Sequence, residues 1–385
     1  MPKIKTGKDC CGCTACASIC PKDAIQMMPD SMGFKFPKID MSKCVECGQC
    51  ERVCAFNDEY KTPDNYKTPI PYGVRQKDEE ELMKSRSGGA FPAFANFILD
   101  KGGVIYGVGY KDHFVVSHRR IDNSVDLDEL RGSKYVQSDL DGIFRQVKSD
   151  LVSGKWVLFS GTGCQTSGLS SYIPDKLKEK LVLVDIVCHG VPGPNLWRDY
   201  LEYVEKRAGK KVEEVDFRNK KIYGWKAHHE SFRFAKSTTT TTTYTYLFYQ
   251  HIMLRESCEN CQFTNLRRTG DLTIADFWGW DKTDKDFNKD DKGASLVLVN
   301  TPKGMDLFNS VKAKFDIIEP KIEDCMQTHL MKPTVQNAKR DVFIKDYERK
   351  GFEYIMKKYG NVGWRYVIKS LSGKVLRRMK RVMGF

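Results

Sequence analysis

The order of apolar and polar positions divides the 385-residue chain into a short amino-terminal part and a longer second part. In the first part, two short apolar stretches at 25–27 and 34–36 flank a polar turn, which predicts a strand–turn–strand hairpin. From residue 73 onward, short apolar runs typical of strands alternate with amphipathic stretches typical of helices. The pattern therefore predicts an α+β protein, with a small domain followed by a mixed α/β domain.

Periodicity and end signals place the elements of the larger part. Helices are expected at 91–99, 139–152, 194–207 and 302–315. Strands are expected at 104–110, 114–119, 156–160, 181–187, 212–217, 231–235, 271–276 and 295–299. The strands at 156–160 and 181–187 are continuously apolar, as buried central strands are. The order of the strands within a sheet does not follow from periodicity.

Shifts in composition set the expected boundaries. Residues 1–58 form the small domain, and 59–72, which contains three prolines, is expected to be a linker. Residues 73–335 form the larger domain, and 336–385 form a basic, mostly helical tail. The threonine run at 238–243, which continues as Tyr244-Thr245-Tyr246, predicts an exposed edge strand or hairpin without chemistry, because threonine and tyrosine have a high β-propensity.

The tail has no acidic residue after Glu353 but many lysines and arginines. Between Trp364 and Phe385, apolar residues recur among these cations, as they do in a basic amphipathic helix. Two interpretations stay open. The tail either contacts an anionic membrane surface or packs against the larger domain.

Eight cysteines near the amino terminus repeat one spacing twice, Cys-x-x-Cys-x-x-Cys-x-x-x-Cys. The first copy is Cys10, Cys13, Cys16 and Cys20, and the second is Cys44, Cys47, Cys50 and Cys54. This is the ligand pattern of a bacterial two-cluster ferredoxin, in which the fourth cysteine of each copy binds the other copy's cluster. One 4Fe-4S cluster is expected on Cys10, Cys13, Cys16 and Cys54, and the second on Cys44, Cys47, Cys50 and Cys20. A tetrahedral zinc site uses four thiolates and leaves the rest of this ladder unexplained.

Four more cysteines lie in the larger part. Cys164 and Cys188 each follow a predicted buried strand, and loops at the ends of neighbouring central strands come together in space. Cys258 and Cys261 form a further Cys-x-x-Cys pair. Spacing alone leaves two interpretations open, a third cluster or ordinary buried thiols.

The cysteine content and the apolar runs indicate where in the cell this chemistry is expected to occur. Because most of the fourteen cysteines serve better as thiolate ligands than as disulfides, a reducing cytoplasm is the expected location. No apolar leader follows Met1, and no apolar run approaches the length of a membrane span. Cys325 is expected to be a small buried side chain. Cys11, which adjoins a predicted ligand, is expected to face away from the cluster.

The formal net charge of +13 is typical of proteins that bind nucleic acid or membranes. Anionic clusters would offset part of this charge. The basic residues are also not interleaved with an aromatic platform, and no recognition motif is present, so no nucleic-acid partner is expected.

Residues from about 85 to 279 resemble the beta subunit of coenzyme F-420 (F420) reducing hydrogenase and its relatives, which include ferredoxin-dependent reductases. The resemblance rests on Gly163-Cys164-Gln165, on Cys188 and on the Cys-x-x-Cys pair. In that family these cysteines hold a 4Fe-4S cluster beside a bound FAD. The resemblance therefore implies a third cluster on Cys164, Cys188, Cys258 and Cys261.

The same resemblance implies FAD contacts in two short segments. They are Ser87, Gly88 and Gly89, and Gly132, Ser133, Lys134 and Tyr135. Glycines let backbone N–H groups approach a pyrophosphate, and Lys134 can offset its charge, although ordinary turns remain the alternative. The Asp276-Phe277-Trp278-Gly279 segment also matches relatives and either places an aromatic ring near the flavin or closes the core.

Clusters carry one electron at a time, whereas a flavin exchanges both one and two electrons. The expected function is that of an oxidoreductase that links a reduced ferredoxin-like protein or F420, through clusters and FAD, to a small-molecule substrate. His189, beside Cys188, is expected to be either a general acid or an orienting loop histidine, and His228 and His229 are expected at the surface. The alternative is an electron-transfer subunit that docks on a partner enzyme and has no substrate chemistry of its own.

Overall fold

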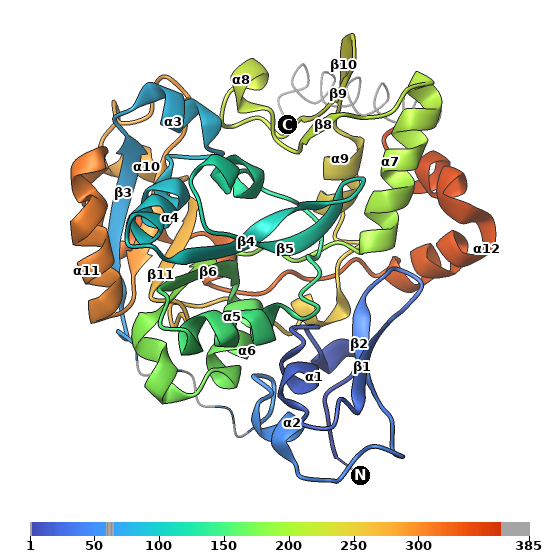
Figure 1. The fold of residues 1–385 in the computed structure, drawn as a ribbon. Coiled ribbons are helices and arrows are strands. Elements are labelled where there is room, and N and C mark those ends of the chain that lie inside the picture. Colours follow the sequence, from blue (N-terminus) through green and yellow to red (C-terminus); the bar gives the residue numbers. More distant parts are fainter. Residues whose placement is uncertain (1, 59, 61–62, 64, 363–385) are drawn as a thin grey trace.

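The amino-terminal part forms a separate small layer at one end of the molecule in a computed structural model that describes residues 2–58, 60, 63 and 65–362 (Figure 1). It contains β1 (Ile25–Pro29) and β2 (Lys35–Ile39), which pair antiparallel, and the short helices α1 (Ala15–Ile19) and α2 (Gln49–Arg52). The Asp30 carboxylate accepts hydrogen bonds from the backbone N–H groups of Met32 and Phe34 and closes the hairpin turn. The predicted hairpin is therefore present.

The larger part is built on an eight-stranded mixed sheet. Its strand order is β13-β3-β12-β11-β7-β6-β4-β5. The strands are β3 (Ile70–Gln76), β4 (Val104–Lys111), β5 (Val115–Ile121), β6 (Val157–Thr162), β7 (Leu181–Ile186), β11 (Leu272–Asp276), β12 (Ser295–Val299) and β13 (Phe315–Ile318). The four central strands β4, β6, β7 and β11 run parallel, and the outer strands are antiparallel to their neighbours. The predicted α+β class is confirmed.

Helices cover both faces of this sheet. On one face, α4 (Ala90–Asp100) and α11 (Pro302–Val311) pack on alternate strand residues such as Leu158 and Val182. On the other face, α5 (Ile143–Val152) and α6 (Gly163–Tyr172) pack on Val157 and Leu183. The same face carries the amino-terminal part, because Cys11, Cys13 and Ala15 belong to this second cluster. The short α3 (Glu79–Lys84) follows β3.

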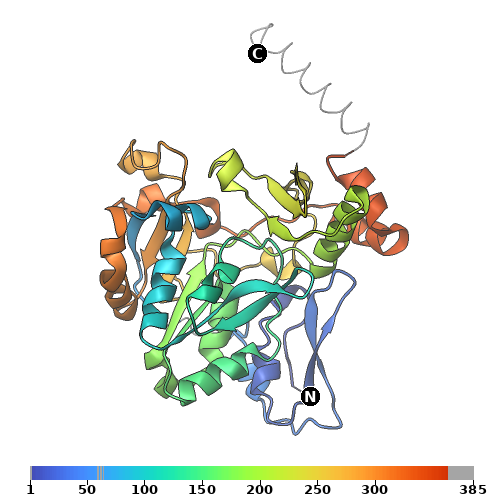
Figure 2. The ribbon, with the colours of Figure 1, turned by 45° about the horizontal axis from the view of Figure 1, so that its top comes forward.

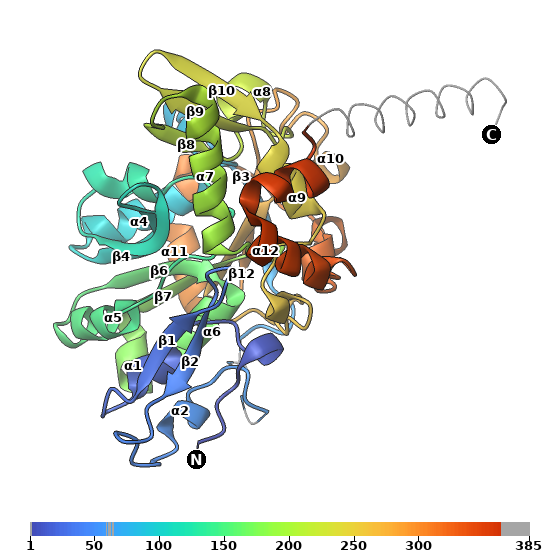
Figure 3. The ribbon, with the colours of Figure 1, turned by 90° about the vertical axis from the view of Figure 1, so that its right-hand side faces the viewer.

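A third layer lies at the end of the molecule opposite the amino-terminal part (Figures 1, 2 and 3). It contains the antiparallel strands β8 (Glu214–Asp216), β9 (Glu230–Phe234) and β10 (Ser237–Thr241). Around them lie α7 (Pro194–Ala208), α8 (Lys220–Tyr223), α9 (Thr243–Tyr249) and α12 (Arg340–Tyr359), while α10 (Trp280–Thr283) follows β11. Aromatic side chains, including Trp197, Tyr200, Phe232 and Tyr244, fill the core of this layer.

The structure corrects the predicted linker. β3 begins at Ile70, inside the stretch 59–72, and pairs with β12 within the large sheet. The backbone N–H of Tyr66 already donates to the carbonyl of Asn300, 2.8 Å away. Pro71 obscured this strand in the sequence, because proline lacks the N–H that a central strand needs. It is tolerated here since β13 pairs only with residues 73–76 and leaves one edge of Pro71 uncovered.

Other boundaries also differ from the sequence expectations. The threonine run does form an edge strand, β10, but Tyr244-Thr245-Tyr246 lies in α9, and Tyr244 is buried. The helix expected at 302–315 ends at Val311, and β13 follows. The basic tail is helical to Tyr359, with a kink at Gly351, whereas the segment 364–385 lies outside the described residues. In the part of the chain that the structure describes, no helix has the length and apolar character needed to cross a membrane.

A buried carboxylate organises the aromatic layer. Glu230 accepts hydrogen bonds from the backbone N–H of Tyr244 (2.7 Å), the hydroxyl of Thr245 (2.7 Å) and the hydroxyl of Tyr200 (3.2 Å). It thereby caps the first turn of α9, which carries aromatic residues toward the rest of the molecule. Burial raises the pKa of Glu230 from 4.5 to about 7 despite these donors. The folded protein therefore holds a proton here that the unfolded chain has released.

We expect Glu230 to make stability pH-dependent. Its folded pKa is raised, so its contribution is fully present below about pH 4.5 and is lost as the pH rises through about 7, by up to about 3 kcal/mol. In Glu230→Gln, which cannot ionise, the thermal midpoint relative to wild type should rise between pH 5.5 and pH 8. If the thermal midpoints of the two proteins change in parallel with pH over this range, Glu230 is ionised in the folded state throughout.

Candidate functional site

The first predicted set of ligands, Cys10, Cys13, Cys16 and Cys54, comes together at the junction of α1 with the larger part. Burial, followed by the proximity of Cys13, Cys10 and Cys54, raises the pKa of the Cys16 thiol. Gly12 and Thr14 adopt left-handed backbone conformations that wrap the loop, and the Gly12 N–H points at the Cys10 sulfur at 3.4 Å. The arrangement gathers four thiols, and burial raises the pKa of three of them, Cys10, Cys16 and Cys54.

The second predicted set lies at the outer end of the amino-terminal part. Cys20, Cys44, Cys47 and Cys50 line one small cavity beneath α2 and β1. The Ala24 N–H points at the Cys20 sulfur at 3.4 Å, and Cys47 is exposed to solvent. All fourteen cysteines are free of disulfides.

The third set is brought together by the sheet. Cys164 stands in the first turn of α6, Cys188 follows β7, and Cys258 ends the short 3₁₀ turn at Glu256–Cys258. Burial, followed by the proximity of Cys258, Cys164 and Cys261, raises the pKa of Cys188. Burial also raises the pKa of Cys258 to about 12 and that of Cys261 to about 11, with neighbouring thiols contributing.

The spacing of these thiols differs from that of a single-ion site. Among the described residues, no group of three or more His, Cys, Asp or Glu side chains could hold one metal ion. A cubane cluster spreads its four thiolates over four irons, so its ligands do not converge on one point. Three sets of four thiols, in a chain with the ferredoxin spacing, fit 4Fe-4S clusters in donor type and number.

A buried ion pair holds the third set in place. The Arg268 guanidinium lies 2.8 Å from the Asp185 carboxylate, and the two side chains are 2% and 0% exposed. Arg268 also donates to the carbonyl groups of Phe263 and Ile186, which flank the Cys258/Cys261 loop and the Cys188 loop. The pair therefore fixes two loops that are far apart in sequence at the position where their cysteines meet.

Arg255 connects the amino-terminal part to the third set. Its guanidinium donates to the carbonyl of Cys10 (2.8 Å), the carbonyl of Lys35 (2.9 Å) and the side chain of Gln137 (2.9 Å). Its backbone N–H donates to Val191, three residues after Cys188. The guanidinium stacks 4.2 Å above the ring of Phe36. The small layer is thus anchored to the loop that carries Cys258.

A cavity of about 370 Å³ opens at the carboxyl ends of the central parallel strands, the usual ligand position in such sheets. The predicted flavin segments line it, with Ser87 and Gly89 on one side and Gly132 to Tyr135 on another. Gly88 lies directly behind this wall, where a Cβ would come within 2.0 Å of the Val74 carbonyl. Cys188 and His189 form a further part of the lining. The cavity therefore adjoins the third set of cysteines.

Buried cations surround this cavity without matching anions. Burial lowers the pKa of Lys134 to about 7, and burial together with Arg86 and Arg75 lowers that of Lys220 to about 7. Burial and the charge of Arg218 lower the pKa of Arg86 to about 10. The hydrogen bonds of these three groups go to backbone carbonyls, and the Arg86 Nε is buried without a partner. An anionic ligand would relieve this excess of positive charge.

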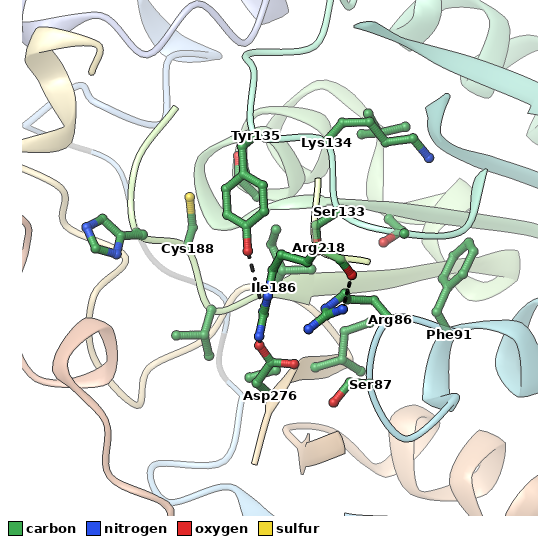
Figure 4. A pocket seen from close by; sticks show the side chains of 18 of the residues that line it. Arg86, Ser87, Phe91, Ser133, Lys134, Tyr135, Ile186, Cys188, Arg218 and Asp276 are labelled. Atoms are coloured by element: carbon green, nitrogen blue, oxygen red, sulfur yellow. Dashed lines mark hydrogen bonds and ion pairs between the residues drawn. The ribbon is translucent and has the colours of Figure 1, made fainter. Parts of the chain in front are cut away.

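At the centre of the cavity, Arg218 pairs with Asp276 at 2.5 Å (Figure 4). Burial alone would lower the pKa of Arg218, but Asp276 raises it above its usual value. Trp278 is 41% exposed, lines the cavity and stacks on Trp225 at 4.5 Å, whereas Phe277 is buried in the core. Phe277 therefore closes the core, and Trp278 forms part of the cavity wall.

Histidines gather at one end of the cavity. His189 lies 2.8 Å from His251 between ring nitrogens, and its ring lies 4.2 Å from that of His329. Burial, with the neighbouring histidines, lowers the pKa of His189 to about 3. The expectation that His228 lies at the surface is wrong: it is partly buried, lines the cavity and hydrogen-bonds the Tyr249 hydroxyl at 2.8 Å.

The structure brings together most of the residues singled out in the sequence and adds others. Cys11 does not face away from the ligands, because it is buried in the same packed cluster as Cys13. Cys325 is a buried side chain, as expected. The Lys134 ammonium donates to the carbonyls of Glu129 and Arg131 and points away from the cavity centre (Figure 4).

Sequence reasoning missed several residues of the site. They are Arg86, Asp185, Arg218, Arg255 and Arg268. Single arginines and aspartates carry no spacing signal, since each acts through partners that are distant in sequence. The one available signal was the position of Arg86, directly before the Ser87-Gly88-Gly89 turn.

Parts of the chain are similar to known families and proteins. Residues 154–324 match the family described as the C terminus of the coenzyme F420 hydrogenase/dehydrogenase beta subunit, and residues 9–57 match the 4Fe-4S dicluster domain. An uncharacterized polyferredoxin-like protein of Methanocaldococcus jannaschii is 37% identical over 14% of this chain, and the chain spans 37% of its length. A chain in a structure of the F420-reducing NiFe hydrogenase complex from Methanosarcina barkeri is similar over 77% of this chain and 93% of its own, with 17% identity and a TM-score of 0.48.

Removing the Arg268 charge should release the third set of cysteines. In Arg268→Met the Asp185 carboxylate stays buried without a partner, which costs about 3–5 kcal/mol of stability. We expect anaerobically purified protein to lose one cluster's share of its iron and to keep the share of the other two, measured by iron analysis. Arg267→Met, at the exposed neighbouring position, is the matched control.

If Arg268→Met does not fold, the double variant Asp185→Asn/Arg268→Met removes both charges and restores folding. An unchanged iron content in the single variant would show that the ion pair does not hold the cysteine loops.

Proposed function

Because the chain belongs to the coenzyme F420 hydrogenase/dehydrogenase beta-subunit family and carries a 4Fe-4S dicluster domain, we propose that it passes electrons through three 4Fe-4S clusters to FAD and reduces a small-molecule substrate. The chain is an iron–sulfur electron-transfer protein of this family. FAD, its proposed partner, exchanges single electrons with clusters and electron pairs with organic substrates. The donor is a reduced ferredoxin-like protein or reduced F420.

One observation carries this proposal: Cys188 shares the wall of the cavity with the Ser87–Gly89 and Gly132–Tyr135 segments. Cys188 is a ligand of the proposed third cluster, and the two segments are the proposed FAD contacts. An electron would therefore travel only across the cavity wall. These segments lie far apart in the sequence, so only the fold brings them together at one cavity wall.

The charges of the cavity fit the pyrophosphate of FAD. α4 begins at Ala90, directly after Gly89, so its positive end faces the cavity together with Arg86. Gly89 has a φ of 83° and gives the turn its left-handed conformation. Lys220 donates to the carbonyls of Leu82 and Ser87 and holds the turn in position. In this proposal Arg86 binds phosphate oxygens, and Lys134 and Lys220 shape the loops.

The positions of the cysteine sets favour one order of transfer. The second set includes the exposed Cys47 and lies at the outer end of the amino-terminal part, so it receives electrons from the donor. The first set adjoins the third, because Gly168 of α6, the helix that carries Cys164, lies against Cys13. Electrons therefore pass from the second set through the first to the third, and from there to the cavity.

His189 is proposed to orient the loop that carries Cys188, because a pKa of about 3 leaves a neutral imidazole that does not serve as a general acid near neutral pH. It lines the cavity next to Cys188 and contacts the ring of His251. His251 in turn bonds the carbonyl of Val335 through its other nitrogen, at 3.0 Å, which orients its ring.

The exposed surface near Cys47 favours a second candidate function. Val45 is 58% exposed, and Met41 is also an exposed apolar side chain beside the second set. Such a surface suits a protein partner, so the chain can instead serve as an electron-transfer subunit whose partner performs the substrate chemistry.

The Arg86 charge should control flavin affinity. In Arg86→Gln, loss of one charged hydrogen bond is expected to weaken FAD binding about tenfold or more, measured by fluorescence titration of flavin-stripped protein. Lys84→Gln, two residues upstream and exposed, should bind FAD as wild type does. Equal FAD dissociation constants for wild type and Arg86→Gln would show that Arg86 does not bind the phosphate groups of FAD.

Reduction in the absence of any protein partner separates the two functions. Protein reduced with dithionite should reoxidise when artificial two-electron acceptors such as quinones are added, because the cavity itself delivers electrons to small molecules. A reduced protein that stays inert to every small acceptor and reoxidises only with a protein partner would favour the subunit.

A further inference from the structure

Thr162, the last residue of β6, contacts a proposed cluster ligand and also lines the cavity. Its hydroxyl oxygen lies 3.1 Å from the sulfur of Cys164, within hydrogen-bond distance. Thr162 is also one of the residues that form the cavity wall. In the parallel pairing of β6 with β7 it stands opposite Ile186, two residues before Cys188. Thr162 therefore lies at the carboxyl ends of the two strands, where the loops of Cys164 and Cys188 both begin.

Hydrogen bonds that involve no thiol hold the backbone of Thr162 in this position. Its N–H donates to the side-chain oxygen of Gln165 at 3.0 Å, and the Gln165 amide group donates to the Ser138 hydroxyl at 3.0 Å. Ser138 in turn bonds the ring of His118, 2.9 Å away. The side chains of Gln165, Ser138 and His118 are all buried. The position of Thr162 beside Cys164 is thus fixed by the core of the larger part.

The chemistry of a cluster ligand decides which of the two groups donates. A cysteine that binds iron is a thiolate and has no hydrogen to give, so the Thr162 hydroxyl is the donor. We propose that this hydroxyl donates a hydrogen bond to the Cys164 ligand of the third cluster and raises the reduction potential of that cluster. Thr162 is a positioning residue that acts through Cys164 and binds no iron. The inference rests on the proposed function, because it requires the third cluster.

A hydrogen-bond donor to a ligand sulfur stabilises the reduced cluster more than the oxidised one. The electron that reaches the third cluster comes from the first, which a ferredoxin-like donor has reduced. It adds one negative charge that the ligand sulfurs share, and the hydroxyl hydrogen bond stabilises this added charge. The hydroxyl keeps its proton, and no bond to iron forms or breaks. The third cluster therefore accepts the electron more readily at the position that adjoins the cavity.

Dye-mediated redox titration of the clusters, followed by electron paramagnetic resonance, tests this inference in variants of the full chain. Thr162→Val removes the hydroxyl and keeps a similar side-chain volume, whereas Thr162→Ser keeps the hydroxyl. Thr301→Val is the matched control. Like Thr162, Thr301 directly precedes a helix, α11, but its hydroxyl bonds the Asp271 carboxylate and the Gly304 N–H instead of a sulfur. Iron content is measured in parallel for wild type and all variants.

We expect Thr162→Val to keep the full iron content and to lower one of the three midpoint potentials. Loss of one hydrogen bond to a charged sulfur corresponds to about a tenfold shift in the one-electron equilibrium, or ~59 mV. Thr162→Ser should stay near the wild-type potential, and Thr301→Val should show no shift. Cys164→Ala, which lacks a ligand of the third cluster, identifies the signal that belongs to this cluster.

Three results would overturn the inference. They are unchanged potentials in Thr162→Val, an equal fall in Thr162→Val and Thr162→Ser, and a loss of iron in Thr162→Val that Thr301→Val does not share. If Thr162→Val does not fold, Thr162→Ala removes the same hydroxyl with a smaller side chain and is titrated in its place. Failure of the proposed function is distinguishable, because wild-type protein would then lack the iron and the signal of a third cluster.

Discussion

The guanidinium of Arg255 is the interaction on which the arrangement of the two parts depends. It is 1% exposed, yet it contacts the carbonyls of Cys10 and Lys35, the Gln137 side chain and the ring of Phe36. Its backbone meanwhile belongs to the segment that leads to Cys258. A buried cation needs partners in every direction, and here those partners come from both parts of the chain. The Arg255 side chain makes all of these hydrogen bonds only when the two parts of the chain are in contact. This contact places the proposed first and third clusters next to each other.

Buried charge follows a consistent pattern across the molecule. The three sets of cysteines concentrate potential negative charge, and burial raises the pKa of most thiols in the first and third sets. Arg86 places positive charge at the cavity wall, and Lys134 and Lys220 add positive charge in the loops around it. Neither group is balanced by the protein alone, whereas Asp185–Arg268 and Asp276–Arg218 are balanced ion pairs. Buried charges without a protein partner lie where ligands of opposite charge fit. Buried charges that form ion pairs within the protein hold loops together.

The fold class and most elements could be predicted, because apolar periodicity is a local property. The central strands β6 and β7 and the helix α7 lie within a residue or two of their expected bounds. The errors have identifiable causes. Proline hid β3, and β13 follows α11 after only a three-residue 3₁₀ turn, so it was taken as the end of a helix. Tyrosines after a threonine run were assigned to a hairpin, although tertiary packing places them in α9.

The sequence by itself indicated the eight amino-terminal cysteines as cluster ligands, because ligand spacing in a ferredoxin motif spans a few residues and does not depend on the rest of the fold. The resemblance to a known family added the other four cysteines and the two segments that line the cavity. Only the tertiary structure decided how these parts connect. The approach of α6 to Cys13, and the role of Arg255, depend on contacts between residues separated by more than a hundred positions. Such contacts leave no local pattern, since each requires the whole sheet and both of its covered faces to form first.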